Sequence, residues 1–214
     1  MRVSLTALAL LLMVGACGPV GGGSGTPAAT ASNVAVKLSD LPSGMHRCDL
    51  SGDIDSYLKK IQTSDPTTYS STKTHWEAAQ KGGATAADVE LYTDSTAHCA
   101  NLATNASQIG SATYKLAVDF VFQFKDEASA VAGYNSDSIF GFSVATLKAT
   151  QLPVTEGTAT GLGKNSIVLT LDIPPQTVYL TVWQNKQFMS ILGIFNIDVA
   201  TDKKIALAEN GRIH

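Results

Sequence analysis

The fold of this chain is decided by residues 114–124, which read YKLAVDFVFQF. Apolar side chains occupy every second position of the stretch, and three of them are phenylalanines. Successive side chains of a β-strand point to opposite faces of the sheet, so a period of two over this length predicts a half-buried strand with an aromatic inner face. Asp126 follows where a helix N-cap would stand, so we expect the strand to lead directly into a helix through Val131.

The last third of the chain repeats this kind of pattern. Alternating apolar residues predict two strands over 167–171 and 178–183, and Asn185-Lys186 fits a two-residue hairpin turn because Asn tolerates positive φ. Residues 188–195 are apolar on both faces, so we place this strand at the centre of the sheet. Asp198 then provides the N-cap of a final helix.

The first half of the chain is richer in helix signals. Apolar residues at helical spacing over 54–61 follow a cap at Asp53, and Ser64-Asp65-Pro66 ends that helix. A second short helix is predicted over 72–81. Residues 84–104 fit either a strand followed by a capped helix or one long helix. The elements together predict an α+β fold: a single domain with an antiparallel sheet packed on one face by helices.

Cysteine usage indicates one internal disulfide. Cys48 and Cys99 are the two cysteines that remain beyond the first 17 residues, and they would close a loop of 52 residues, worth about 4 kcal/mol of stabilisation by chain entropy. The alternative is a zinc site formed by His46, Cys48, His98 and Cys99, although this spacing matches no zinc-finger or zinc-ribbon pattern.

The N-terminus has the pattern of a secretory signal. Arg2 precedes a short apolar run over 8–13, and the run ends at Val14-Gly15-Ala16-Cys17. This ending resembles the lipobox of bacterial lipoproteins. The resemblance implies that residues 1–16 are removed as a signal peptide and that Cys17 is acylated, for example with palmitate. The lipid would then anchor the protein, on the extracytoplasmic side, to a membrane of the bacterial envelope. The alternative is an ordinary secretory signal with an incidental cysteine.

Residues 17–35 are predicted to be a flexible tether. Gly, Ser, Thr, Ala and Pro dominate this stretch, and such a composition buries too little apolar surface to fold. We therefore expect the globular domain to cover residues 36–214.

Charge and motifs exclude several function classes. The net charge is −3, and the densest basic groups are the pairs Lys59-Lys60 and Lys203-Lys204, so no positive face for nucleic acid is expected. The sequence contains no G-x-S-x-G, H-E-x-x-H or P-loop motif. We therefore predict no catalytic residue, no cofactor and, apart from the Cys/His alternative, no metal.

The remaining functional clue is aromatic. Tyr179, Trp183 and Phe188 are expected on the face of the C-terminal strands opposite Val178, Leu180 and Val182. If helices leave that face open, the three rings form a possible binding face. We therefore expect a non-enzymatic envelope module that binds a small molecule, a glycan or a protein. The alternatives are a hydrolase with a dispersed active site and a structural or assembly lipoprotein.

Overall fold

The computed structural model describes residues 29–136, 143–149, 152–174 and 176–214. The predicted signal peptide, Cys17 and the first part of the predicted tether lie outside these ranges.

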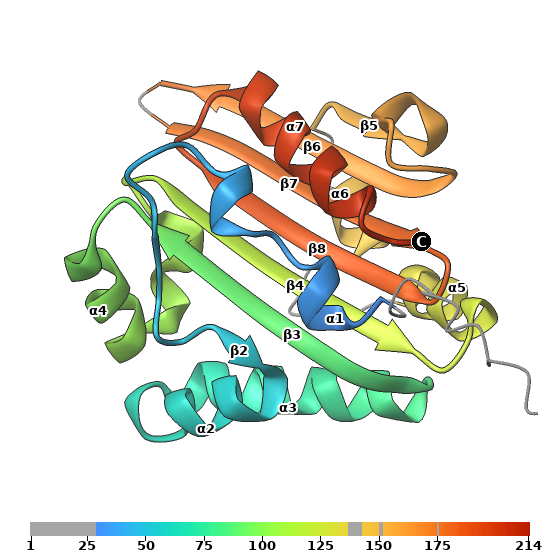
Figure 1. Ribbon diagram of the computed structural model, residues 1–214, viewed down its shortest axis with the longest axis horizontal. Helices are drawn as coiled ribbons and strands as arrows, with labels where there is room; N and C mark the ends of the chain where they lie inside the picture. Colours follow the sequence, from blue (N-terminus) through green and yellow to red (C-terminus); the bar gives the residue numbers. More distant parts are fainter. Residues whose placement is uncertain (1–28, 137–142, 150–151, 175) are drawn as a thin grey trace, which may run out of the picture.

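The core of the domain is one antiparallel sheet (Figure 1). Its strand order is β1-β3-β4-β8-β7-β6-β5, and β2 pairs with β3 beside this path. The predicted α+β fold is confirmed, and β8 lies between β4 and β7, as its two apolar faces predict. The strands are β1 His46–Arg47, β2 Gly52–Asp53, β3 Ala84–Thr93, β4 Leu116–Phe124, β5 Val154–Glu156, β6 Asn165–Ile173, β7 Gln176–Asn185 and β8 Phe188–Phe195.

One face of the sheet packs against most of the helices. Tyr57 meets the ring of Phe120 edge-on at a centroid distance of 6.0 Å, and Trp76 lies 6.2 Å from Phe122. The aromatic inner face predicted for β4 therefore anchors the helical layer. This layer consists of α2 Ile54–Ser64, α3 Pro66–Lys81, α4 Thr96–Thr104, the 3₁₀ helix η2 Ala106–Ser111, α5 Glu127–Asn135 and α6 Val144–Ala149.

The opposite face is also covered, which corrects the expectation of helices on one face only. Figure 1 shows α1 (Ala31–Val34) and α7 (Val199–Asn210) in front of the sheet. Ala117, Asp119 and Val121, on the second face of β4, are at most 1% exposed. The strand is thus buried on both faces rather than half-buried, because the small or branched residues between the aromatics also find a covering layer.

The globular domain begins before residue 36. Thr30 caps α1, and Val34 and Ala35 are completely buried against Val121, Phe188 and Ile213. The prediction that the tether extends to residue 35 is therefore wrong. Small residues such as these carry little apolar area each, but they allow the segment to pack closely on the sheet.

Several local sequence signals for helix caps and turns are confirmed, although some of the element boundaries are shifted. Asp53, Asp126 and Asp198 cap α2, α5 and α7 as predicted. Residues 84–104 form a strand and then a helix capped by Ser95. The hairpin turn lies at Lys186-Gln187, one residue later than predicted, since Asn185 still pairs with Phe188 and Lys186 takes the positive φ of 49°.

Candidate functional site

A cavity of about 400 Å³ lies between the sheet and the helical layer. Its floor is formed by β4, β7 and β8, and its walls by the start of α3, by η2 and by one side chain of α2. The described residues that line it are Tyr57, Thr67, Thr68, Ser71, Thr72, Ser107, Ile109, Gly110, Val118, Phe120, Leu180, Ile191, Gly193 and Phe195.

The floor is hollow because one strand residue lacks a side chain. Gly193 pairs with Val118 on β4 and with Leu180 on β7, so it lies in the middle of the apolar face. A Cβ added at Gly193 would meet Phe195 Cε2 at 3.3 Å and Leu180 Cδ1 at 3.8 Å. The missing side chain therefore leaves a depression at the centre of the sheet, bordered by carbon atoms.

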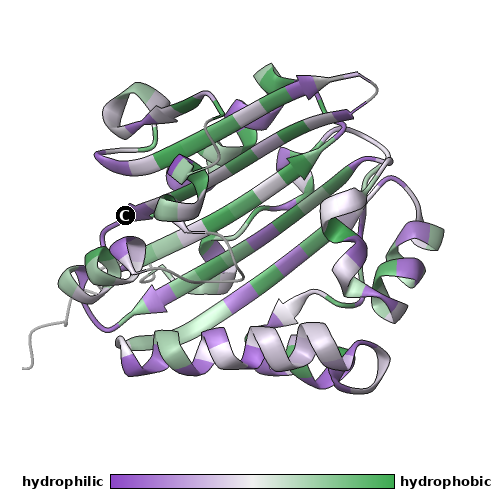
Figure 2. Cartoon of the chain, turned by 180° about the vertical axis from the view of Figure 1, so that it is seen from behind, coloured by the Kyte–Doolittle hydropathy of each residue, from purple (hydrophilic) through white to green (hydrophobic). Residues whose placement is uncertain are grey.

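The wall is rich in hydroxyl groups. Pro66 occupies the first turn of α3, where its missing N–H costs nothing, so the helix begins six residues before the predicted start at Thr72. This early start places Thr67, Thr68 and Ser71 along the cavity. In Figure 2, α3 is mostly white and purple while the central strands carry long green stretches, which agrees with a polar wall over an apolar floor.

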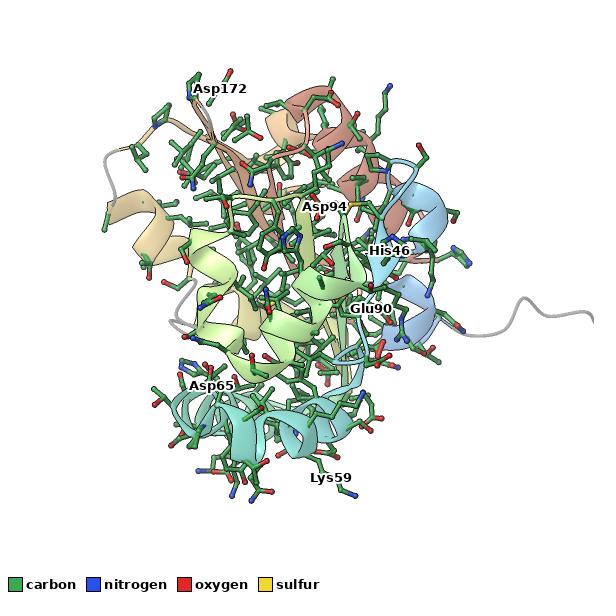
Figure 3. The ribbon with its side chains drawn as sticks, turned by 90° about the vertical axis from the view of Figure 1, so that its left-hand side faces the viewer. His46, Lys59, Asp65, Glu90, Asp94 and Asp172 are labelled. Carbon is green, nitrogen blue, oxygen red and sulfur yellow. A yellow bond between two sulfur atoms is a disulfide. The ribbon has the colours of Figure 1, made fainter. Side chains whose placement is uncertain are left out.

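Asp65 joins the two walls. Its carboxylate accepts hydrogen bonds from the Thr68 amide at 3.0 Å, from the Thr68 hydroxyl at 2.8 Å and from the Ser107 amide at 3.0 Å. Figure 3 shows Asp65 where α2 and α3 meet the segment of α4 and η2. These bonds, led by that of the Thr68 amide, lower the pKa of Asp65, so the group is ionised at neutral pH. Burial, and next the charge of Asp65, raise the pKa of Tyr57.

The polar side chains of the described cavity lining are hydroxyl-bearing. Its described lining contains no His, Cys, Asp, Glu, Lys or Arg side chain. Within the described parts of the chain, moreover, no three His, Cys, Asp or Glu side chains are grouped so that they would hold a metal ion. An apolar pocket with a few convergent polar groups is typical of small-molecule binding sites.

The aromatic residues predicted as a binding face lie elsewhere. Tyr179, Trp183 and Phe188 are 2%, 0% and 0% exposed, so the hypothesis of an open aromatic face is wrong. Tyr179 and Trp183 pack with Ile205 and Ala206 of α7, which covers this face of the strands. The cavity is on the other face, beside Leu180.

The cysteines form a disulfide. Cys48 and Cys99 are joined, with their Cα atoms 5.0 Å apart, so their sulfur atoms are not free thiolates for the alternative zinc site. His98, the third residue of the alternative zinc set, makes a 2.6 Å contact from Nδ1 to Asp94. Its ring stacks on the ring of Tyr114 at a centroid distance of 3.8 Å. His46, the remaining member, is exposed on β1.

Buried carboxyl groups are a feature that the sequence analysis missed. Asp119 of β4 and Glu209 of α7 are 1% and 0% exposed, and Ser190 of β8 lies beside Glu209. Asp119 accepts a 2.9 Å hydrogen bond from the Val36 amide, whereas both Glu209 oxygens lack a partner of good geometry. Burial raises the pKa of Asp119 to about 8, and burial and the charge of Asp119 raise that of Glu209.

Arg212 completes this arrangement. Its guanidinium donates to the carbonyls of Val34 and Ala35 and pairs with Asp40 at 2.9 Å. The buried groups thus tie the N-terminal segment and α7 to the sheet, away from solvent, and we assign them a structural role.

Comparison of the chain with protein-family models, with curated proteins and with solved structures found no match. Among the residues that the structure describes, no helix has both the length and the apolar character needed to cross a bilayer.

Proposed function

We propose that this protein is a lipid-anchored, extracytoplasmic binding protein that takes an apolar small molecule into the cavity between α3, η2 and the sheet. The cavity is the observation that carries the proposal. Its volume of about 400 Å³ falls within the range of small-molecule sites, roughly 300–1,000 Å³, and the side chains of its floor are all apolar.

The proposed location rests on the N-terminal sequence. The likeness of Val14-Gly15-Ala16-Cys17 to a lipobox supports acylation at Cys17 and anchoring to an envelope membrane. The disulfide between Cys48 and Cys99 agrees with an oxidising compartment outside the cytoplasm. An anchored protein meets apolar molecules that are concentrated at the same membrane, which makes such a location useful to a module that binds them.

Binding without catalysis is the function that the lining supports best. A hydrolase would need a nucleophile with a base in reach. The Thr68 hydroxyl of the lining does donate to the Asp65 carboxylate, but the amides of Thr68 and Ser107 also bind this carboxylate and its pKa is lowered, so Asp65 is a weak base. The carboxyls of Asp119 and Glu209 lie on the opposite side of the sheet and are closed to solvent.

Photo-cross-linking of the full chain in its own membranes tests the proposal. The probe is an uncharged twelve-carbon alcohol that carries a diazirine within the chain. We expect labelled peptides from residues 66–72 and 189–195, and we expect this labelling to be competed by excess unmodified dodecanol. Labelling confined to other segments, or labelling that dodecanol does not compete, would overturn the proposal.

A further inference from the structure

The cavity has two chemically different sides. Its floor, on β4, β7 and β8, offers carbon atoms to a ligand, whereas the wall on α3 and η2 carries the hydroxyls of Thr67, Thr68, Ser71, Thr72 and Ser107. A ligand that satisfies both is apolar along most of its length and carries hydrogen-bonding groups at one end. A cavity of about 400 Å³ is near the lower limit for small-molecule sites, so it fits one chain better than two.

At the polar side of the cavity, the Thr68 hydroxyl is left to accept a hydrogen bond. The Thr68 hydroxyl donates its hydrogen to Asp65 at 2.8 Å, so its oxygen has only acceptor capacity left for a ligand. A ligand hydroxyl provides the donor that this oxygen needs, whereas a carboxylate or a phosphate diester accepts only.

Asp65 also occupies two of the backbone N–H groups that could hold an anion. Helix N-termini bind anions through free backbone N–H groups, but here the amides of Thr68 and Ser107 both donate to the Asp65 carboxylate. The described lining supplies no basic side chain as a substitute. The polar side of the cavity therefore has a fixed negative charge behind its hydroxyl wall, and no countercharge in its described lining.

We propose that the ligand is a single-chain, uncharged amphiphile whose head group donates hydrogen bonds, such as a monoacylglycerol, and that Asp65 selects against anionic chains of the same length. This inference rests on the proposed binding function and specifies the class of ligand. The head group lies beside Thr68 and Ser107, and the chain extends across Gly193 toward Leu180 and Ile191.

The experiment compares two ligands that share one chain, 1-monododecanoylglycerol and dodecanoate, at pH 7.5 and below their micellar concentrations. The protein is the full chain with Cys17→Ser, and each ligand displaces the uncharged dye N-phenyl-1-naphthylamine. We expect monododecanoylglycerol to bind at least tenfold more tightly than dodecanoate. Because the discrimination is electrostatic, the ratio should decrease when the salt concentration rises from 0.02 M to 0.5 M.

A charge-removing variant identifies Asp65 as the cause. Asn is as good an N-cap as Asp, so Asp65→Asn keeps the cap bond from the Thr68 amide to Oδ1 and removes the charge, while the amide nitrogen that replaces Oδ2 gives up the bond from the Ser107 amide. We expect dodecanoate to bind at least fivefold more tightly to this variant, with monododecanoylglycerol changed less than twofold. The matched control is Asp53→Asn, because Asp53 caps α2 through the same two bonds, to the amide and hydroxyl of Ser56, outside the cavity lining.

The outcomes separate the two proposals. Equal affinity of the two ligands, or a ratio that neither salt nor Asp65→Asn alters, would overturn the inference about ligand class and leave the binding function standing. Failure of both ligands and of the dye to bind would contradict the proposed function itself. If Asp65→Asn does not fold, the salt dependence of the unmodified protein still decides the question.

Discussion

Filling the cavity at Gly193 should stabilise the protein while it abolishes binding. Gly193 lies on β8, facing the cavity, and its φ is outside the left-handed region, so a side chain brings no backbone strain. We therefore consider Gly193→Val, since a β-branched residue suits a strand.

The expected magnitude follows from three terms. Replacing a strand glycine stabilises by about 0.5–1 kcal/mol, because the unfolded chain loses conformational freedom. The two further methyl groups add at most about 1.6 kcal/mol of apolar burial. The new Cβ lies 3.3 Å from Phe195 Cε2, so the ring must move by a few tenths of an ångström, and crowding of this kind costs about 1 kcal/mol. The net gain is about 1 kcal/mol, or roughly 2–4 °C in Tm for a domain of this size.

The assay pairs thermal unfolding with titration of N-phenyl-1-naphthylamine. We expect Gly193→Val to raise Tm and to weaken dye binding at least tenfold. The control is Thr155→Val, an isosteric change at an exposed position of the edge strand β5. A Tm several degrees below that of the unmodified protein would show that the space above Gly193 is already filled. Unchanged dye binding in a folded variant would refute the location of the site.

Three further predictions concern anchoring, the disulfide and pH. Cys17→Ser should move the protein from the membrane fraction to the soluble fraction, and unchanged fractionation would contradict the lipoprotein interpretation. Cys48→Ser and Cys99→Ser should each lower stability by about 2–4 kcal/mol in non-reducing denaturant titrations, and clearly unequal losses would argue against a shared bond. Asp119 and Glu209 stay protonated in the fold above the pH at which they ionise when unfolded, so stability should decrease as the pH rises from about 4 to about 8, the folded pKa of Asp119. Thermal unfolding across that range checks the sign, and Asp119→Asn should flatten the slope, whereas stability that increases toward pH 8 would contradict the buried, protonated state.

Below pH 4 a different set of carboxyl groups determines how stability depends on pH. The N-cap carboxylates of Asp53, Asp65, Asp126 and Asp198 have lowered pKa values because backbone and side-chain donors bind their charged forms. Stability from a lowered carboxyl pKa is lost as pH falls through the folded value. The two sets together place the stability maximum near pH 4–5.

The parts of the fold that the sequence predicts are those set by neighbouring residues. The period of two over 114–124 identifies β4, and Asp53, Asp126 and Asp198 mark helix starts, because these signals depend on side chains a few residues apart. Residues 84–104 fit either a strand followed by a helix or one long helix, and only the hydrogen-bonded ladder between β3 and β4 decides for the strand.

The site depends on relations that no local pattern contains. The cavity requires Gly193 to face Val118 and Leu180 across two strands and the first turn of α3 to lie above them. The burial of Trp183 depends on α7, and that of Asp119 on the N-terminal segment and α7. The hydroxyl-rich run after Pro66 is a sequence signal for the polar wall. Because the sequence predicts a helix start at Thr72, these residues fall outside the predicted helix and are not recognised as a wall.

Isothermal titration calorimetry of the full chain carrying Cys17→Ser with 1-monododecanoylglycerol, repeated at several temperatures, tests the central claim most directly. We predict saturable binding of one molecule per chain with a negative heat-capacity change, which marks the burial of apolar surface. Binding that does not saturate, or that saturates with no heat-capacity change, would contradict the account of this protein as a binder of apolar chains.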